Sequence, residues 1–234
     1  MDEATAALFP SEFEESALGL IPKGWRVGSL GEIVSARGGF AYKGDSFKDI
    51  GHPVIKIKNI VGDGTVNFSD AQCIDNDLAN KTAKFILKDG DIVIAMTGAT
   101  IGKTGIIVTD GKNPYLNQRV AKFESKLKGQ TYTWFVFVAF QYGFIFEQVV
   151  NTAQGSAQPN ISTTGIESVR LVLSSNEDLL LTFNDIVTPL FLRWIDNQKQ
   201  SQTLTTLRDT LLPRLISGQL HINQAQDVIN EVGA

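Results

Sequence analysis

The feature that most constrains the fold is a change in hydrophobic spacing near residue 175. Before it, apolar residues alternate with polar ones or form short runs between Gly- and Asp-containing turns, which is typical of β-strands. After it, apolar residues recur every three or four positions, as along one face of an α-helix. The sequence therefore predicts an α+β fold, with a mixed-sheet domain at about residues 21–174 and a helical region at about 175–218. Residues 1–20 are expected to form an N-terminal arm, and residues 219–234 a C-terminal tail.

The helical region has recognisable start and stop signals. Ser175–Asp178 can cap a helix and place acidic side chains in its first turn. Thr188-Pro189 predicts the start of a second helix, because Thr is a good N-cap and Pro suits the first helical position. Pro213 is expected to kink this helix near its end, and Gly218 to terminate it. A helix from 188 to 216 would be roughly 43 Å long, somewhat more than the about 34–36 Å of one turn of B-DNA.

Residues in this region that are separated by steps of four and three form a heptad seam. Such a seam favours a coiled coil with a partner helix, and polar residues on it can select the register or the partner. The alternative is a single amphipathic helix that packs on its own domain. The seam consists of Leu190, Trp194, Asn197, Ser201, Leu204, Arg208, Leu211 and Leu215.

The region before residue 175 is predicted to be mostly strands. Residues 131–151 are the exception, because they are apolar nearly all round and predict a helix buried against a sheet. Turns are expected at Arg37-Gly38-Gly39, Gly62-Asp63-Gly64, Lys88-Asp89-Gly90 and Asp110-Gly111-Lys112. The predicted strands are Val54–Ile60, Asp91–Met96, Thr104–Val108 and Val169–Leu173.

Several classes of protein are disfavoured by composition. No run of eighteen apolar residues is present and the start is acidic, so neither a membrane span nor a secretory signal is expected, and the cytoplasm is the default compartment. A single cysteine, Cys73, excludes an internal disulfide framework. His52 and His221 are too few and too far apart to suggest a metal cluster, so we expect no metal and no cofactor.

Two segments resemble catalytic motifs but do not fit them. Gly98–Thr104 resembles a phosphate-binding P-loop, yet it has three residues between its glycines where that motif has four, and a strand is predicted after it. Asn113-Pro114-Tyr115 resembles the catalytic loop of amino-methyltransferases but lacks the second proline before the aromatic residue. We therefore assign no catalytic residue to this chain.

The charge is unevenly distributed. The whole chain has a net charge of −4, but residues 21–128 carry 16 Lys and Arg against 11 Asp and Glu. This segment also contains amides, hydroxyls and cations of the kinds that contact DNA bases and phosphates. The alternatives are that the charge is ordinary surface variation and that the amides satisfy backbone groups in loops. The candidate DNA-binding residues are Thr97, Thr100, Lys103, Asn117, Gln118, Arg119, Gln158 and Asn160, with Lys43, Lys56 and Lys58 as candidate phosphate contacts.

Taken in order along the chain, several motifs resemble those of the specificity subunits (HsdS) of type I restriction–modification systems. Each motif is weak alone, but together they extend over nearly the whole sequence. The segments that carry the resemblance are Gly19–Trp25 with Leu30–Ile33, Asp91–Val93 leading to Gly98–Lys103, Leu116–Val120, Gly155–Ser162 and Leu207–Gly218.

The resemblance implies a non-catalytic protein that recognises double-stranded DNA. Members of this family typically hold two target-recognition domains separated by two helices in an antiparallel coiled coil, and each domain reads one half of a bipartite site. The subunit docks two adenine-N6 methyltransferase (HsdM-type) subunits, and restriction (HsdR-type) subunits join that complex. A role for Asn117–Arg119 and Gln158–Asn160 in scaffolding is the alternative to base reading, because motifs shared across the family are expected to serve shared structure.

This sequence departs from the family pattern because it holds one recognition domain and one helical region. It is expected either to pair with a copy of itself through the helix, giving a symmetric bipartite target, or to be the second half of a longer chain. The rival from another class is a coiled-coil assembly scaffold without its own DNA readout.

Overall fold

The computed structural model describes residues 3–109, 111–126, 132–143, 145–153 and 160–219. The chain divides into two compact units, Met1–Phe191 and Leu192–Ala234. The first unit contains all the strands among the described residues. The described part of the second unit is most of one long helix, from residue 192 to residue 216, and the turn that follows it.

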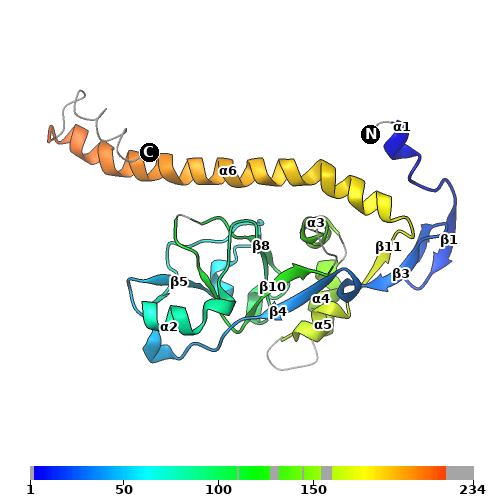
Figure 1. Ribbon diagram of the computed structural model, residues 1–234, viewed down its shortest axis with the longest axis horizontal. Helices are drawn as coiled ribbons and strands as arrows, with labels where there is room; N and C mark the ends of the chain where they lie inside the picture. The colour runs from blue at the N-terminus through cyan, green and yellow to red at the C-terminus, as the bar shows by residue number, and fades with distance from the viewer. Residues whose placement is uncertain (1–2, 110, 127–131, 144, 154–159, 220–234) are drawn as a thin grey trace. The chain divides into compact units, whose positions relative to one another are not determined.

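The centre of the first unit is a four-stranded antiparallel sheet in the order β4-β10-β7-β8 (Figure 1). β7 is buried along its whole length, as its uninterrupted apolar sequence predicts. Apolar residues of β7 and β10 pack with Ile55, Leu87 and Ile107 into one core cluster. The four strands are β4 (Val34–Gly38), β7 (Ile92–Ala95), β8 (Thr104–Ile106) and β10 (Val120–Ser125).

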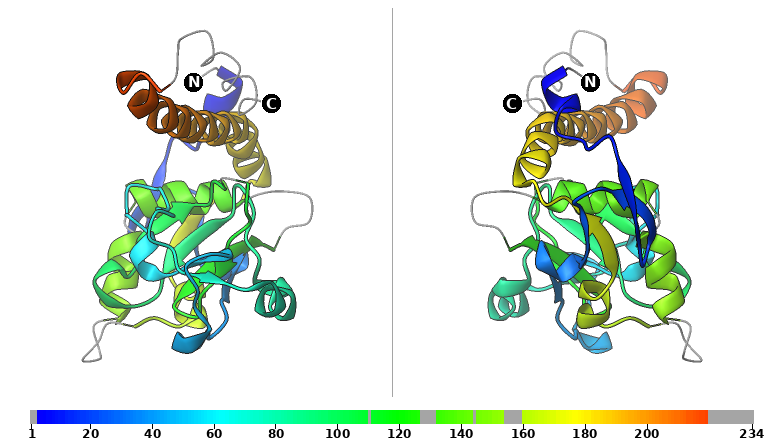
Figure 2. Two further views of the ribbon diagram at one scale, coloured as in Figure 1. Left: turned by 90° about the vertical axis from the view of Figure 1, so that its left-hand side faces the viewer. Right: turned by 90° about the vertical axis from the view of Figure 1, so that its right-hand side faces the viewer.

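Three smaller sheets surround this centre. A three-stranded sheet has the order β6-β5-β9, with β5 antiparallel to β6 and parallel to β9. Two antiparallel pairs, β1-β2 and β11-β3, lie next to one another (Figures 1 and 2). Their strands are β1 (Phe13–Ser16), β2 (Gly19–Pro22), β3 (Arg26–Ser29), β5 (His52–Ile55), β6 (Cys73–Ile74), β9 (Tyr115–Leu116) and β11 (Arg170–Leu173).

Short helices cover and connect the strands. α3 contacts β8 and β10, α5 contacts β4, and α4 contacts β11. The α-helices of this unit that precede the long helix are α1 (Glu3–Ala6), α2 (Asn76–Lys81), α3 (Thr133–Tyr142), α4 (Ile145–Ala153) and α5 (Thr163–Glu167). The 3-10 helices are η1 (Leu30–Glu32), η2 (Gly44–Ser46), η3 (Ile57–Asn59), η4 (Ala83–Phe85) and η5 (Gly98–Thr100).

The long helix α6 (Glu177–Ile216) confirms the predicted helical region, but it is continuous. The prediction of a new helix at Thr188-Pro189 is wrong, because both residues lie inside α6 and the Thr188 hydroxyl makes no hydrogen bond among the described residues. Pro189 is exposed in a helix of 40 residues, where the one backbone hydrogen bond that proline removes is a local loss. The helix also continues past Pro213 to Ile216, and Gly218 follows with the positive φ of 71° that is typical of a helix end.

Three local predictions need correction. The helix predicted at 131–151 is two helices, because α3 ends at Tyr142 and Gly143 is extended. The strand predicted at Val54–Ile60 ends at Ile55, where the chain turns into η3. Of the predicted turn at Arg37-Gly38-Gly39, the first two residues belong to β4.

Within the described part of the chain, no single helix is long and apolar enough to cross a membrane. The bent pair Thr133–Tyr142 and Ile145–Thr152 meets those two requirements only when its members are taken together.

Candidate nucleic-acid interface

The topology of the central sheet brings most of the predicted DNA-contacting segments to one edge. Because the four strands are antiparallel, the pairs Gly38–Ala121, Val120–Ala95 and Ile94–Thr104 place the end of β4, the start of β10, the end of β7 and the start of β8 together. Residues 39–43, 96–103, 117–119 and 160–161 therefore lie at the same edge, which we call the loop edge.

Backbone hydrogen bonds hold the loop edge in one arrangement. The Met96 N–H donates to the Arg119 carbonyl and the Ile161 N–H donates to the Met96 carbonyl, both at 3.0 Å. The Gln118 N–H donates to the Phe40 carbonyl at 2.9 Å. Four segments that are far apart in the sequence are thus fixed to one another through their main chains, without the use of their side chains.

Gly39 allows two of these segments to approach closely. A Cβ atom at this position would lie 2.3 Å from the Leu116 carbonyl oxygen, much closer than nonbonded atoms can approach. Since a backbone oxygen cannot rotate away as a flexible side chain can, only glycine fits here without a shift of the chain. The next residue, Phe40, donates its N–H to the same Leu116 carbonyl at 2.9 Å.

The loop between β7 and β8 contains three of the predicted residues. The Thr97 hydroxyl oxygen is buried without a hydrogen-bond partner among the described residues. Thr100 donates to the Ile57 carbonyl at 3.4 Å, and Lys103 donates to the Val61 carbonyl at 3.3 Å. Both are weak contacts with neutral groups, so the Lys103 charge is not neutralised by them. The loop ends in strand β8, as the sequence predicted, and not in the helix that a P-loop requires.

The segment Asn117–Arg119 contains one buried and two exposed side chains. Asn117 is buried, and its side-chain oxygen accepts the Arg119 N–H at 3.4 Å. It therefore holds the turn, which agrees with the scaffolding alternative for this residue. Gln118 and Arg119 have exposed side chains, and Arg119 forms no ion pair among the residues described.

Asn160 extends the loop edge from a distant part of the chain. It forms an antiparallel bridge with Thr97 and its side chain is exposed. Directly after it, Ile161 is buried and the Ser162 hydroxyl accepts the Gly165 N–H at 3.0 Å, which caps α5. Gln158, the other candidate in this segment, lies outside the described residues.

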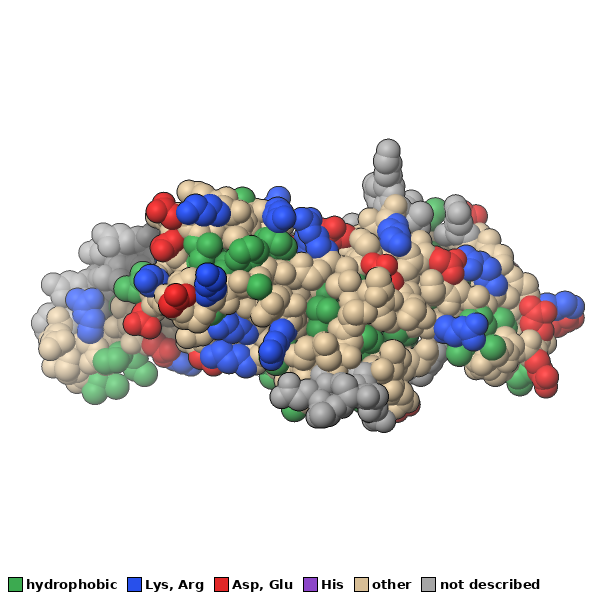
Figure 3. All heavy atoms as spheres, turned by 90° about the horizontal axis from the view of Figure 1, so that it is seen from below, with side chains coloured by type: hydrophobic (Ala, Val, Ile, Leu, Met, Phe, Trp, Pro, Cys, Tyr) green, Lys and Arg blue, Asp and Glu red, His purple; other side chains and the backbone are tan. Residues whose placement is uncertain are grey.

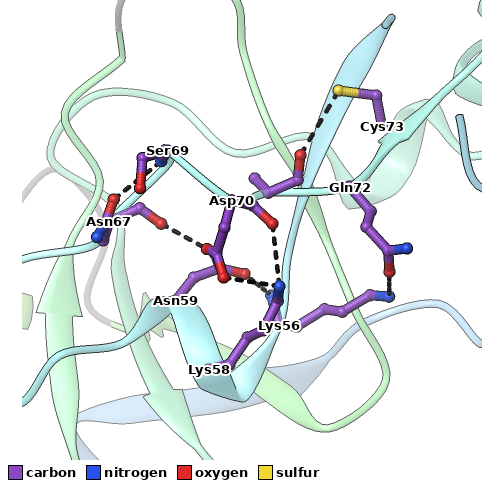
Figure 4. Close-up of polar contacts among 9 residues, drawn as sticks. Lys56, Lys58, Asn59, Asn67, Ser69, Asp70, Gln72 and Cys73 are labelled. Carbon is purple, nitrogen blue, oxygen red and sulfur yellow. Dashed lines mark hydrogen bonds and ion pairs between the residues drawn. The ribbon is translucent and has the colours of Figure 1, made fainter. Parts of the chain in front are cut away.

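Lys56 and Lys58 belong to a polar network that the sequence did not predict (Figure 4). The Lys58 ammonium pairs with the Asp70 carboxylate at 2.8 Å, and Asp70 also accepts from the Asn59 side chain at 3.1 Å. The Lys56 ammonium donates to Gln72 and lies 3.4 Å from the centre of the Phe47 ring. Burial, and next the charge of Lys58, lower the pKa of Lys56.

Lys43 differs from these two lysines. It occupies the N-cap position of η2 and is exposed, and its backbone carbonyl accepts from Ser46. Its side chain forms no ion pair within the described ranges. Of the three candidate phosphate contacts, Lys58 is thus ion-paired, whereas Lys43 and Lys56 have no carboxylate partner among the described residues, and Lys56 is held by a neutral amide and a ring.

Sequence reasoning missed an aromatic group beside the loop edge. The Phe40 ring is 36% exposed, and it lies 5.0 Å from the ring of Tyr42 and 5.6 Å from that of Phe85, measured between ring centres. Arg37 and Lys84 lie over the Phe85 ring. The available signal was an aromatic residue directly after a Gly-Gly pair, with basic residues near each aromatic in the sequence.

The predicted seam of α6 contains both exposed and covered positions. Leu190 is 63% exposed and Leu204 65% exposed, so both leucines are accessible to a partner helix. Among the polar positions, Asn197 and Ser201 are exposed, and Arg208 is paired with its neighbour Asp209 at 2.8 Å. Trp194 and Leu215 are half-buried, and Leu211 is buried.

In the described part of the chain, no three His, Cys, Asp or Glu side chains are arranged to hold a metal ion. Burial raises the pKa of the Cys73 thiol, which makes it a poorer nucleophile at neutral pH.

Known proteins resemble this chain in sequence and in fold. The family model described as "Type I restriction modification DNA specificity domain" matches residues 22–178. The chain belongs to this family. The sequence-based assignment to the type I specificity subunits is therefore confirmed, and so is the α+β fold class with a long C-terminal helix that fits a coiled-coil-forming region.

Two archaeal proteins illustrate the relationship. The chain is 27% identical over 207 residues to the type I restriction enzyme MjaIX specificity subunit of Methanocaldococcus jannaschii, covering 87% of this chain and 46% of that protein. It is 26% identical over 221 residues to the MjaVIII specificity subunit of the same organism, covering 90% of this chain and 49% of that protein. The chain thus spans about half the length of these curated relatives.

A solved structure shows the same fold. The type I restriction–modification S subunit from M. genitalium superposes with a TM-score of 0.53 at 18% sequence identity. The match covers 82% of this chain and 46% of that one.

Proposed function

We propose that this type I specificity domain reads one half of a bipartite DNA site and performs no catalysis itself. The observation that carries the proposal is the loop edge, where Gln118, Arg119 and Asn160 expose polar side chains from segments whose backbones are already hydrogen-bonded to one another. Preorganised loops of this kind can recognise a ligand without first losing conformational freedom.

The exposed groups match the chemistry of base edges. Arginine pairs with guanine through two hydrogen bonds, and asparagine and glutamine pair with adenine in the same way. Lys43 and Lys103 are suited to phosphates, which fix the register of a protein on the duplex. In this proposal Asn117 scaffolds the turn, while Gln118, Arg119 and Asn160 face the DNA.

The long helix supplies the proposed assembly surface. Its 40 residues correspond to about 60 Å at 1.5 Å per residue, enough for several heptads of a coiled coil. We propose that α6 pairs with the helix of a second specificity domain, in a homodimer if this chain acts alone. The complex would dock adenine-N6 methyltransferase subunits and, through them, a restriction subunit. The transfer of the methyl group to adenine would then be carried out by the methyltransferase subunits and not by this chain.

Methylome sequencing tests the proposal directly. Cells carrying this chain with its cognate methyltransferase subunit should contain N6-methyladenine in a split motif, and the motif should be symmetric if the chain homodimerises. Replacing Gln118 and Arg119 with alanine should abolish or relax the motif while leaving the complex assembled.

Three results would contradict different parts of the proposal. Methylation that depends on this chain but keeps the same motif in the Gln118/Arg119 variant would remove these residues from base reading. A stable complex in which this chain never binds DNA would favour the assembly scaffold. An asymmetric motif, obtained with no other specificity chain present, would overturn the homodimer.

A further inference from the structure

Next to the loop edge lies a surface that combines aromatic rings with cations, formed by Arg37, Phe40, Lys84 and Phe85, which we call the aromatic patch. Phe85 packs against the main core cluster, so its ring is a fixed platform. Phe40 leans on this ring, with the ring centres 5.6 Å apart, and keeps part of its surface exposed to solvent. The patch is thus rigid on the inside and open on the outside.

Both cations of the patch lie over the Phe85 ring, and of the two only Arg37 has a carboxylate partner among the described residues. The Lys84 ammonium lies 5.0 Å from the centre of the Phe85 ring, and across the described residues it has no carboxylate partner. The Arg37 guanidinium carbon lies 5.9 Å from the same centre. Its contact with Glu124 is long, at 3.5 Å, and joins two exposed side chains. A cation–π contact positions a cation but leaves its full charge available.

The patch is continuous with the loop edge through the main chain. Gln118 donates its N–H to the Phe40 carbonyl at 2.9 Å, and Phe40 itself follows Gly39 in the first loop of that edge. Arg37 is the residue of β4 that pairs with Lys122 of β10, so the patch begins where the central sheet ends. On the underside of this unit, below α2 and β5, Lys and Arg side chains, with some Asp and Glu between them, border a group of hydrophobic side chains (Figure 3).

We propose that the aromatic patch is a second DNA contact, which binds the backbone flanking the bases read by the loop edge. Lys84 and Arg37 would bind phosphates, and the exposed part of Phe40 would lie against the sugars or a thymine methyl group, which are the apolar parts of a duplex. The inference rests on the proposed function, because a flanking contact has meaning only beside a DNA-reading edge. Duplex DNA is favoured over an acidic protein because the patch shares its backbone hydrogen bonds with that edge.

The salt dependence of DNA binding distinguishes a lysine that contacts a phosphate from a nearby lysine that does not. Each phosphate contact contributes about 0.9 to the slope of log K against log salt concentration. We therefore expect Lys84→Ala, measured by fluorescence anisotropy on a labelled mixed-sequence duplex with the methyltransferase complex, to reduce the slope by about 0.9. Lys84→Arg should restore the slope, and Phe40→Leu should leave it unchanged because no charge is removed.

Lys23→Ala is the matched control. Lys23 is also an exposed lysine, but it is paired with Glu12 in the N-terminal hairpin, so its removal should not alter the slope. If the wild-type complex binds with a clear salt slope and Lys84→Ala keeps it, the aromatic patch is not a DNA contact, although the proposed function stands. If Lys84→Ala instead weakens assembly with the methyltransferase subunits, the patch is a protein interface. If the wild-type complex does not bind DNA at all, the proposed function fails and this inference fails with it.

Discussion

Two basic regions of the first unit differ in what their charges already contact. In the segment 56–72, Lys58 is paired with Asp70 at 2.8 Å, and this hydrogen bond is the largest cause of the lowered pKa of Asp70. Lys56 is held between Gln72 and the Phe47 ring. At the loop edge, by contrast, Arg119 is exposed and forms no ion pair among the residues that the structure describes.

The difference shows that the number of lysines in a segment says little about DNA binding. A phosphate must displace an existing carboxylate before it can bind a paired lysine, whereas an unpaired arginine loses only water. We therefore expect Lys58 to serve its own loop and Arg119 to remain available to a ligand. The predictions below test this division, from the largest expected effect to the smallest.

The largest effect is expected at Asn59, which is 0% exposed. Its side-chain oxygen accepts the Lys56 N–H at 2.9 Å, and its amide donates to the Asn67 carbonyl and to Asp70. Because Asn59→Ala leaves these groups without a buried partner, we expect it to lower the free energy of unfolding by about 3 kcal/mol. Chemical denaturation followed by circular dichroism measures this change.

Asn59→Asp is a second test of the same network, because it keeps the shape and the acceptor oxygen but cannot donate to Asp70. It should also destabilise the unit, since two carboxylates would then face each other. Stability equal to wild type in both variants would show that the network of Figure 4 does not hold this loop.

The next effect is expected at Arg119, and it concerns DNA and not stability. Arg119→Ala should weaken the binding of the complex to a duplex that contains the motif found by methylome sequencing. We expect a loss of about tenfold, which corresponds to one charge-assisted base contact. The free energy of unfolding should stay close to that of wild type, because the side chain is exposed. Arg119→Lys keeps the charge but not the two-pronged geometry, so it should retain non-specific affinity and lose discrimination. Full discrimination by Arg119→Lys would mean that Arg119 contacts a phosphate and not a base.

The fold was predictable where one period dominates the sequence. The buried run Ile92–Ala95 and the helical spacing after residue 175 each left one reasonable interpretation. The prediction of a strand at Val54–Ile60 was wrong beyond Ile55. The alternating apolar and polar residues continue there, but the chain forms η3, in which the Asn59 side chain turns inward and accepts the Lys56 N–H. The prediction of a new helix at Thr188-Pro189 was wrong because a capping pattern is local, while a helix is stabilised over its whole length.

For the candidate site, the sequence offered residue types but not their grouping in space. Asn, Gln and Arg next to one another suggested base edges, but only the sheet register shows that 96–97, 117–119 and 160–161 meet. The sequence also could not distinguish Lys58 from Lys43, because the Asp70 partner is set by the loop that Asn59 organises. Such pairings depend on long-range packing, which no local pattern encodes.

The smallest effect is expected at Lys58, the residue that tests the division most sharply. If a paired lysine does not take part in DNA binding, Lys58→Ala should leave the slope of log K against log salt concentration unchanged. Arg119→Ala, in contrast, should reduce this slope if the Arg119 side chain releases counterions from the DNA. Asp70→Ala provides the reverse experiment, because it frees the Lys58 charge without adding a new one. Stronger non-specific binding by Asp70→Ala, measured by anisotropy at low salt, would show that the carboxylate masks this lysine. A reduced slope for Lys58→Ala would instead mean that phosphate displaces Asp70, and the two regions would then share one interface.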